Sequence, residues 1–171
     1  MMKVLGALLI VMATTWAGFE AAKRLSERPR QLRQLKTALQ SLEAEIVYGL
    51  TPLNEACMHL AGQLPKPLTW FFETFAKRLN EGEKSVPEAW NQSLEEVWRL
   101  SSLRQGEFEV MKQFGATLGR HDRDHQQKQI RLTIAHLERE EAEAKDEQVR
   151  YEKMVKSLGF LAGLLIVILF I

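Results

Sequence analysis

The sequence predicts an all-α fold, a bundle of about six helices flanked by N- and C-terminal transmembrane helices. Apolar residues recur at helical spacing in every segment, and the period-two alternation of strands is nowhere sustained. Two uncharged apolar runs, Val4–Phe19 and Leu158–Ile171, flank the rest of the sequence. Every acidic residue, and every Lys and Arg except Lys3, lies between Glu20 and Lys156. This division predicts a charged helical domain that is anchored to a membrane twice.

Both apolar runs are shorter than the roughly 20 residues that cross a bilayer. Met1, Met2, Ala21 and Ala22 can lengthen the first run while Lys3 snorkels to a headgroup, and Met154 and Val155 can lengthen the second in the same way. The predicted organisation is therefore an N-terminal transmembrane segment (1–22), a cytoplasmic helical bundle (23–157) and a C-terminal transmembrane segment (158–171).

Two other interpretations of the apolar runs remain open. A run this short is often a buried core helix, although Leu158–Ile171 is apolar around its whole circumference, unlike a half-buried helix. The N-terminal run could also be a signal peptide, with Lys3 as its positive region and a poor cleavage site at Thr15–Ala17. The single cysteine, Cys57, excludes an intrachain disulfide framework and a lipid-attachment site near the N-terminus.

Basic residues predict the orientation. They gather at the inner edges of the two runs, and only Lys3 lies on the far side; the ten inner residues are Lys23, Arg24, Arg28, Arg30, Arg33, Lys36, Lys145, Arg150, Lys153 and Lys156. Because cytoplasmic flanks carry the Lys and Arg excess, region 20–157 is expected in the cytoplasm and both termini across the membrane. Gly159 and Gly163 form a small-residue face that can pack against Ala13 and Ala17 of the other span.

The central region is one domain in size and carries no net charge, since its 22 acidic residues match the 22 basic residues other than Lys3. We therefore expect no nucleic-acid partner. Its first helix is predicted from an apolar seam at 3–4 spacing and ends at Gly49, after which Thr51-Pro52 begins the next helix. The two buried faces are Leu25, Leu32, Leu35, Leu39, Leu42 and Ile46, then Leu53, Cys57, Leu60 and Leu64.

Two further helices follow the turn at Pro65–Pro67. The first buries Leu68, Phe72, Phe75 and Leu79, and a polar loop at Asn80–Lys84 ends it. Ser85 and Glu88 then predict a capping box, and the second helix buries Trp90, Leu94 and Val97. Trp70 and Trp98 are expected to be partly exposed.

Ser102 and Gln105 are expected to cap the next helix, whose buried side carries Met111, Phe114 and Leu118, and Gly115 and Gly119 mark its end. From His121 no Pro or Gly occurs before Gly159, which predicts one helix of about 37 residues. Its charged run Glu138–Glu147 is expected to be a solvated face with i, i+4 ion pairs, and a docking site is the alternative.

No motif in the sequence indicates catalysis. Cys57 lies on an apolar helix face, where a buried, inert thiol is expected. The candidate metal site is His121-Asp122-Arg123-Asp124-His125, but helix capping by the two aspartates explains it better, because Arg123 would oppose a cation. We expect a protein that is not an enzyme, with no cofactor, no metal and no small-molecule substrate.

Three stretches resemble the stage III sporulation protein AB family over essentially the whole chain. They are Leu39–Leu53, then Phe114–Gly119 with Asp122 and Gln126, and finally Leu158-Gly159. The family is similar to the F-type platform domain of type II secretion and type IV pilus systems, a six-helix antiparallel bundle. The platform proteins carry two such domains and more spans, whereas this chain has one, so a homo-oligomer is possible.

The resemblance implies a membrane platform of the channel, or feeding tube, between mother cell and forespore. Its implied partners are the secretion-type ATPase of the same operon, sporulation protein AA, and the other stage III sporulation channel proteins. The implied place is the mother-cell-derived outer forespore membrane, with the bundle on the mother-cell side. Two other classes compete with this reading: a membrane-anchored signalling or sensor protein whose long helix transmits movement, and an enzyme that uses the His121–His125 cluster.

Overall fold

Helices and the loops between them make up the whole described part of the chain. The computed structural model describes residues 23, 26–119 and 123–170, with only the backbone for residues 123, 156–157 and 159–170. In order, the elements are a first helix over residues 26–43, its continuation as the π-helix η1 (Ala44–Tyr48), and α2 (Leu53–Gln63), α3 (Leu68–Glu81), α4 (Val86–Trp98), α5 (Gln105–Thr117) and α6 (Arg123–Phe170). The fold is therefore an all-helical bundle.

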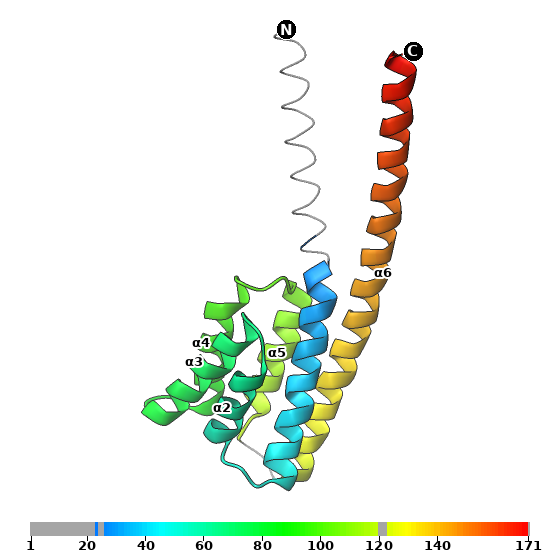
Figure 1. Ribbon diagram of the computed structural model, residues 1–171. Helices are drawn as coiled ribbons and strands as arrows, with labels where there is room; N and C mark the ends of the chain where they lie inside the picture. The colour runs from blue at the N-terminus through cyan, green and yellow to red at the C-terminus, as the bar shows by residue number, and fades with distance from the viewer. Residues whose placement is uncertain (1–22, 24–25, 120–122, 171) are drawn as a thin grey trace.

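The first helix and α6 lie side by side and antiparallel, while α2 to α5 cover the other side of the first helix (Figure 1). α6 has 48 residues, or about 72 Å of helix at 1.5 Å per residue. It therefore continues far beyond the bundle. We call the end at which it leaves, marked by residues 26–28, 99–104 and 147–150, the exit end. The opposite end, formed by residues 44–52, is the far end.

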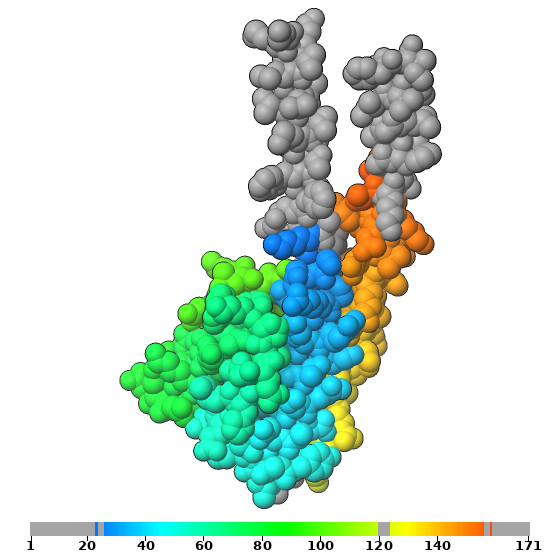
Figure 2. Space-filling view, in the orientation of Figure 1, coloured from blue at the N-terminus to red at the C-terminus, as the bar shows by residue number. Residues whose placement is uncertain are grey.

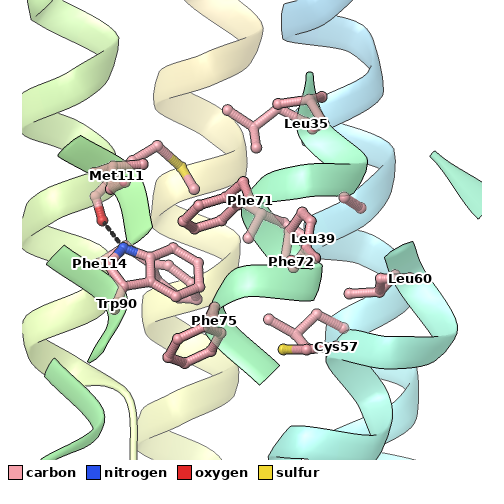
Figure 3. Close-up of a cluster of buried hydrophobic side chains, with 14 of the residues drawn as sticks. Leu35, Leu39, Cys57, Leu60, Phe71, Phe72, Phe75, Trp90, Met111 and Phe114 are labelled. Atoms are coloured by element: carbon pink, nitrogen blue, oxygen red, sulfur yellow. Dashed lines mark hydrogen bonds between the residues drawn. The ribbon is translucent and has the colours of Figure 1, made fainter. Parts of the chain in front are cut away.

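An aromatic cluster forms the centre of the core (Figure 3). Trp90 is fully buried and meets the rings of Phe71, Phe75 and Phe114 edge to face, with centroids 4.7, 5.0 and 5.4 Å away. Its indole Nε1 donates a hydrogen bond of 2.8 Å to the carbonyl oxygen of Met111. Edge-to-face pairs add to the energy of area burial, and the hydrogen bond satisfies the buried indole N–H. The cluster thereby fixes α4 against α3 and α5.

Local signals place several boundaries where the sequence predicts them. Gly49 caps η1, and Ser85 and Glu88 form the capping box of α4, with the Ser85 N–H donating to Glu88 Oε2 at 3.0 Å. Trp70 is partly exposed and Trp98 half-buried. These signals succeed because each depends on residues within a few positions of one another.

Other boundaries differ from the prediction because tertiary contacts take the capping groups. Thr51 does not cap α2, since its Oγ1 donates to Glu45 Oε2 at 2.7 Å, and Pro52 takes the N-cap position. Ser102 does not cap α5, since its N–H donates to Gln31 Oε1, and α5 begins after Arg104. α6 passes through Gly159 without a break, so it exceeds the expected 37 residues.

The two predicted membrane segments have different standings in the structure. Residues 1–22, with Ala13 and Ala17, lie outside the described part of the chain. Residues 158–170 continue α6 as regular helix. Among the helices of the described residues, none combines the length and the apolar character that a membrane crossing requires.

Candidate functional site

α6 contacts the bundle through a buried side that changes in character along its length. Toward the far end this side carries Ile130, Thr133 and Leu137, all buried. The next positions at the same 3–4 spacing are Glu141 and Ala144, also buried. A carboxylate thus occupies a position where the helical period would place an apolar residue. From there to the exit end, charged side chains join α6 to the first helix and α5.

Arg28 is the centre of this charged contact and is only 4% exposed. Its Nε donates to Glu107 Oε1 at 2.8 Å, its Nη2 to Glu140 Oε2 at 2.9 Å and its Nη1 to Glu147 Oε2 at 3.3 Å. Glu107 of α5 is fully buried and also accepts the backbone N–H of Arg104 at 2.6 Å. Arg28 therefore ties the first helix to both α5 and α6.

Arg104 completes the cluster from the α5 side. Its Nη1 and Nη2 donate to Glu147 Oε1 and Oε2 at 2.9 and 2.7 Å, the bidentate geometry that favours arginine over lysine. These hydrogen bonds lower the pKa of Glu147 below its usual value. We call Arg28, Arg104, Glu107, Glu140 and Glu147 the exit-end ion cluster.

A second group of ion pairs surrounds Glu141. Its carboxylate accepts Arg33 Nε at 3.0 Å, Lys36 Nζ at 3.0 Å and Lys145 Nζ at 2.8 Å. Burial alone would raise the pKa of Glu141, but the hydrogen bonds from these cations outweigh it and lower the pKa to about 2. Glu141 is therefore ionised at neutral pH although it is buried.

These contacts correct the expectation for the run Glu138–Glu147. The prediction of a solvated face held by i, i+4 pairs is wrong for its inward side, where the ion pairs join α6 to other helices. One i, i+4 pair is present, Glu141 with Lys145. The sequence contained a signal for this, because basic residues recur at 3–5 spacing along the first helix opposite the acidic run.

The far end presents apolar side chains to solvent. Tyr48 is 69% exposed and Leu50 is 58% exposed. Leu50 has a φ of +55°, a left-handed conformation that costs a branched side chain energy. Such strain, like the π-helix that precedes it, occurs preferentially at functional sites. The far end is therefore a candidate interaction surface.

Sequence reasoning missed Leu50 because the glycine beside it drew attention. Gly49 has an ordinary φ of −78°. Its need for glycine is spatial, since a Cβ there would lie 2.8 Å from the Glu45 carbonyl oxygen. The chain reverses one residue later, at Leu50. No sequence rule assigns a positive φ to a leucine that follows a glycine.

The structure brings most of the residues singled out in the sequence into one core. Buried together are Leu35, Leu39, Leu42, Phe72, Phe75 and Phe114, and Ile46 packs on them while half-buried. Gly115 does not mark the end of a helix but lies inside α5, against Trp90. Gly119 adopts a φ of +73° after α5. Gly159 and Gly163 lie on the part of α6 that extends beyond the bundle.

Neither candidate for chemistry forms a reactive site in the described residues. Cys57 is fully buried, and burial raises its pKa to about 12, so its thiol is unreactive at neutral pH. His121 and Asp122 lie outside the described part of the chain, and Asp124 and His125 belong to the first turn of α6. Where side chains are described, no three His, Cys, Asp or Glu residues are placed to share a metal ion.

Comparisons with known proteins agree with this architecture. The family model described as stage III sporulation protein AB matches residues 3–171. The stage III sporulation protein AB of Bacillus subtilis (strain 168) is 57% identical over 169 residues, which cover 99% of each chain. A solved structure of stage III sporulation protein AB has a TM-score of 0.70 and 53% identity, and the match covers 72% of this chain and 98% of the solved one.

The match spans nearly the entire chain, and the fold agrees with the solved structure. The resemblance in Leu39–Leu53 and Phe114–Gly119 is therefore confirmed, and with it a role in sporulation. The chain belongs to the stage III sporulation protein AB family.

Proposed function

We propose that this protein is a non-enzymatic membrane platform of the channel between mother cell and forespore, and that it recruits the secretion-type ATPase, sporulation protein AA. The observation that carries the proposal is the exit-end ion cluster. It joins the beginning of the first helix to α6 just where α6 leaves the bundle. A load on either chain segment at this end therefore reaches the core of the bundle through Arg28 and Glu107.

In this proposal residues 1–22 and 158–171 are the two membrane anchors. Both follow directly from the helices that the cluster holds together, and both are apolar. The basic residues beside them place the bundle, residues 23–157, in the mother-cell cytoplasm and the termini across the outer forespore membrane. Other stage III sporulation channel proteins would meet the anchors from that side.

The far end is the surface proposed for the ATPase. It lies at the opposite end of the bundle from the anchors (Figure 1), so a cytoplasmic partner reaches it without hindrance from the bilayer. Exposed Tyr48 and Leu50 supply the kind of apolar and aromatic contact that dominates protein interfaces. The strained φ of Leu50 fixes its side chain in an outward position.

Co-purification tests the proposal directly. The full chain in detergent should retain sporulation protein AA from the source cell, and Leu50→Gly should retain less, because glycine accepts the left-handed backbone but offers no side chain. Leu100→Gly, which removes a leucine that is 62% exposed at the exit end, is the matched control and should retain as much as the parent. If the parent retains no ATPase, the platform proposal is wrong. Equal losses in the two variants would exclude the far end as the docking surface.

A further inference from the structure

We propose that the loop between α4 and α5, together with Lys23, contacts the anionic phospholipid headgroups of the membrane that holds the anchors. The inference rests on the proposed membrane anchoring and adds a third contact to it. The bundle would then be oriented against the bilayer instead of swinging on two helices. We call residues 99–104 and Lys23 the basic edge.

The loop lies at the exit end, close to where the described part of the first helix begins. Arg99 to Leu103 line a shallow hollow together with Lys23 and Glu27. In Figure 2 the green atoms of the loop lie at the upper edge of the bundle, beside the blue atoms of the first helix. Leu100 is 62% exposed at this edge, among the most exposed large apolar side chains of the described residues. An exposed leucine beside cations is typical of surfaces that enter the headgroup region.

The charge of the basic edge is largely uncompensated. No ion pair joins Lys23 or Arg99 to another described residue, whereas Arg104 is paired with Glu147. The acidic residue in the hollow, Glu27, lies 3.2 Å from Arg30. Residues 99–106 contain no acid. Exposed Arg150 and Lys153 of α6 add positive charge at the same end. An anionic surface is therefore the complementary partner.

The height of the loop fits this contact. The bidentate pair between Arg104 and Glu147 fixes the loop beside residue 147 of α6. Lys156, the last charged residue, follows nine positions later, or about 14 Å along the axis. A headgroup layer of about 5 to 7 Å covers part of that gap, and a helix tilt of about 20° brings one side of the bundle closer. Long, flexible cations reach the remaining distance.

The test uses the full chain in lipid nanodiscs with an environment-sensitive fluorophore on a new cysteine. Leu100→Cys carries the label at the basic edge, and Leu50→Cys carries it at the far end as the matched control. Cys57 can stay in place because it is buried and its pKa is about 12. In discs that contain phosphatidylglycerol, the label at position 100 should show a blue-shifted emission and a loss of intensity to quenchers attached near the headgroups. The label at position 50 should show neither change.

Charge dependence distinguishes headgroup binding from mere proximity. Adding Arg99→Gln, phosphatidylcholine discs or high salt should each reduce the quenching at position 100, since one cation near an anionic surface changes the occupancy roughly fivefold. Quenching no greater than at position 50, or equal quenching in neutral discs, would overturn the contact. A chain that does not co-fractionate with the discs would overturn the anchoring itself, whereas a co-fractionating chain with an unshifted label removes only the basic-edge contact.

Discussion

The indole ring of Trp90 occupies the space that a side chain at position 115 would need. A Cβ added to Gly115 would lie 2.0 Å from Cδ1 of Trp90 and 2.5 Å from its Nε1. The ring has little freedom to retreat, because Phe71, Phe75 and Phe114 surround it and its N–H is bonded to Met111. Gly115 is thus the complement of the largest side chain in the core.

Gly115→Ala is therefore expected to destabilise the bundle. Overpacking a well-filled core costs about 1 to 3 kcal/mol, and the short distance to Trp90 favours the upper part of that range. The matched control is Gly106→Ala in the same helix, where an added Cβ meets nothing within 4 Å. This control should be neutral or stabilising by up to about 1 kcal/mol. Thermal unfolding followed by circular dichroism compares the two, and equal midpoints would contradict the close packing.

Leu39→Ala should lower the stability much more than Gln40→Ala. Leu39 is fully buried in the seam of the first helix, whereas its neighbour Gln40 is exposed. Truncation of a buried leucine costs about 2 to 5 kcal/mol, because it leaves a cavity as well as removing apolar contact. Urea unfolding of the two variants measures the difference. Small and equal effects would mean that the first helix faces another way.

Arg28→Met should be strongly destabilising, whereas Arg30→Met should have little effect. Replacing Arg28 leaves the buried carboxylate of Glu107 without its cation, and loss of one partner of a buried pair costs about 3 to 5 kcal/mol. Arg30 has an exposed side chain, and its pair with Glu27 is of the kind that contributes at most about 1 kcal/mol. Urea unfolding at two salt concentrations measures both. A small effect of Arg28→Met would show that Arg104 compensates Glu107 by itself.

Acid should weaken the bundle through Glu141. Its pKa in the folded state, about 2, lies below the usual value of 4.5, so ionised Glu141 stabilises the fold at higher pH. This contribution is complete above the unfolded pKa and disappears as the pH falls from about 4.5 towards 2. Glu141→Gln should therefore flatten the loss of stability in that window. The lowered pKa values of Glu88 and Glu147 leave some acid sensitivity in the variant.

The sequence predicted those features that depend on neighbouring residues. The apolar period exposed the seam around Leu39, and spacing alone identified the Ser85–Glu88 capping box. Contacts between distant residues could not be predicted in this way. Arg28 and Glu107 are 79 positions apart, and nothing local marks them as partners. Charged residues are assigned to solvent by default, which is why the inward side of Glu138–Glu147 was misjudged.

The ion pairs between the first helix and α6 also act as a ruler. Four of the contacts join residues whose numbers add up to 174: 26 and 148, 33 and 141, 36 and 138, 43 and 131. Two helices with apolar seams of heptad spacing can slide by seven residues and still match apolar faces. Such a slip, to a sum of 181, would bring Lys36 beside Lys145, Arg28 beside Lys153 and Glu43 beside Glu138. Every one of these contacts is a repulsion. The charges thus select a single alignment of the two helices, and with it the height at which both leave the bundle.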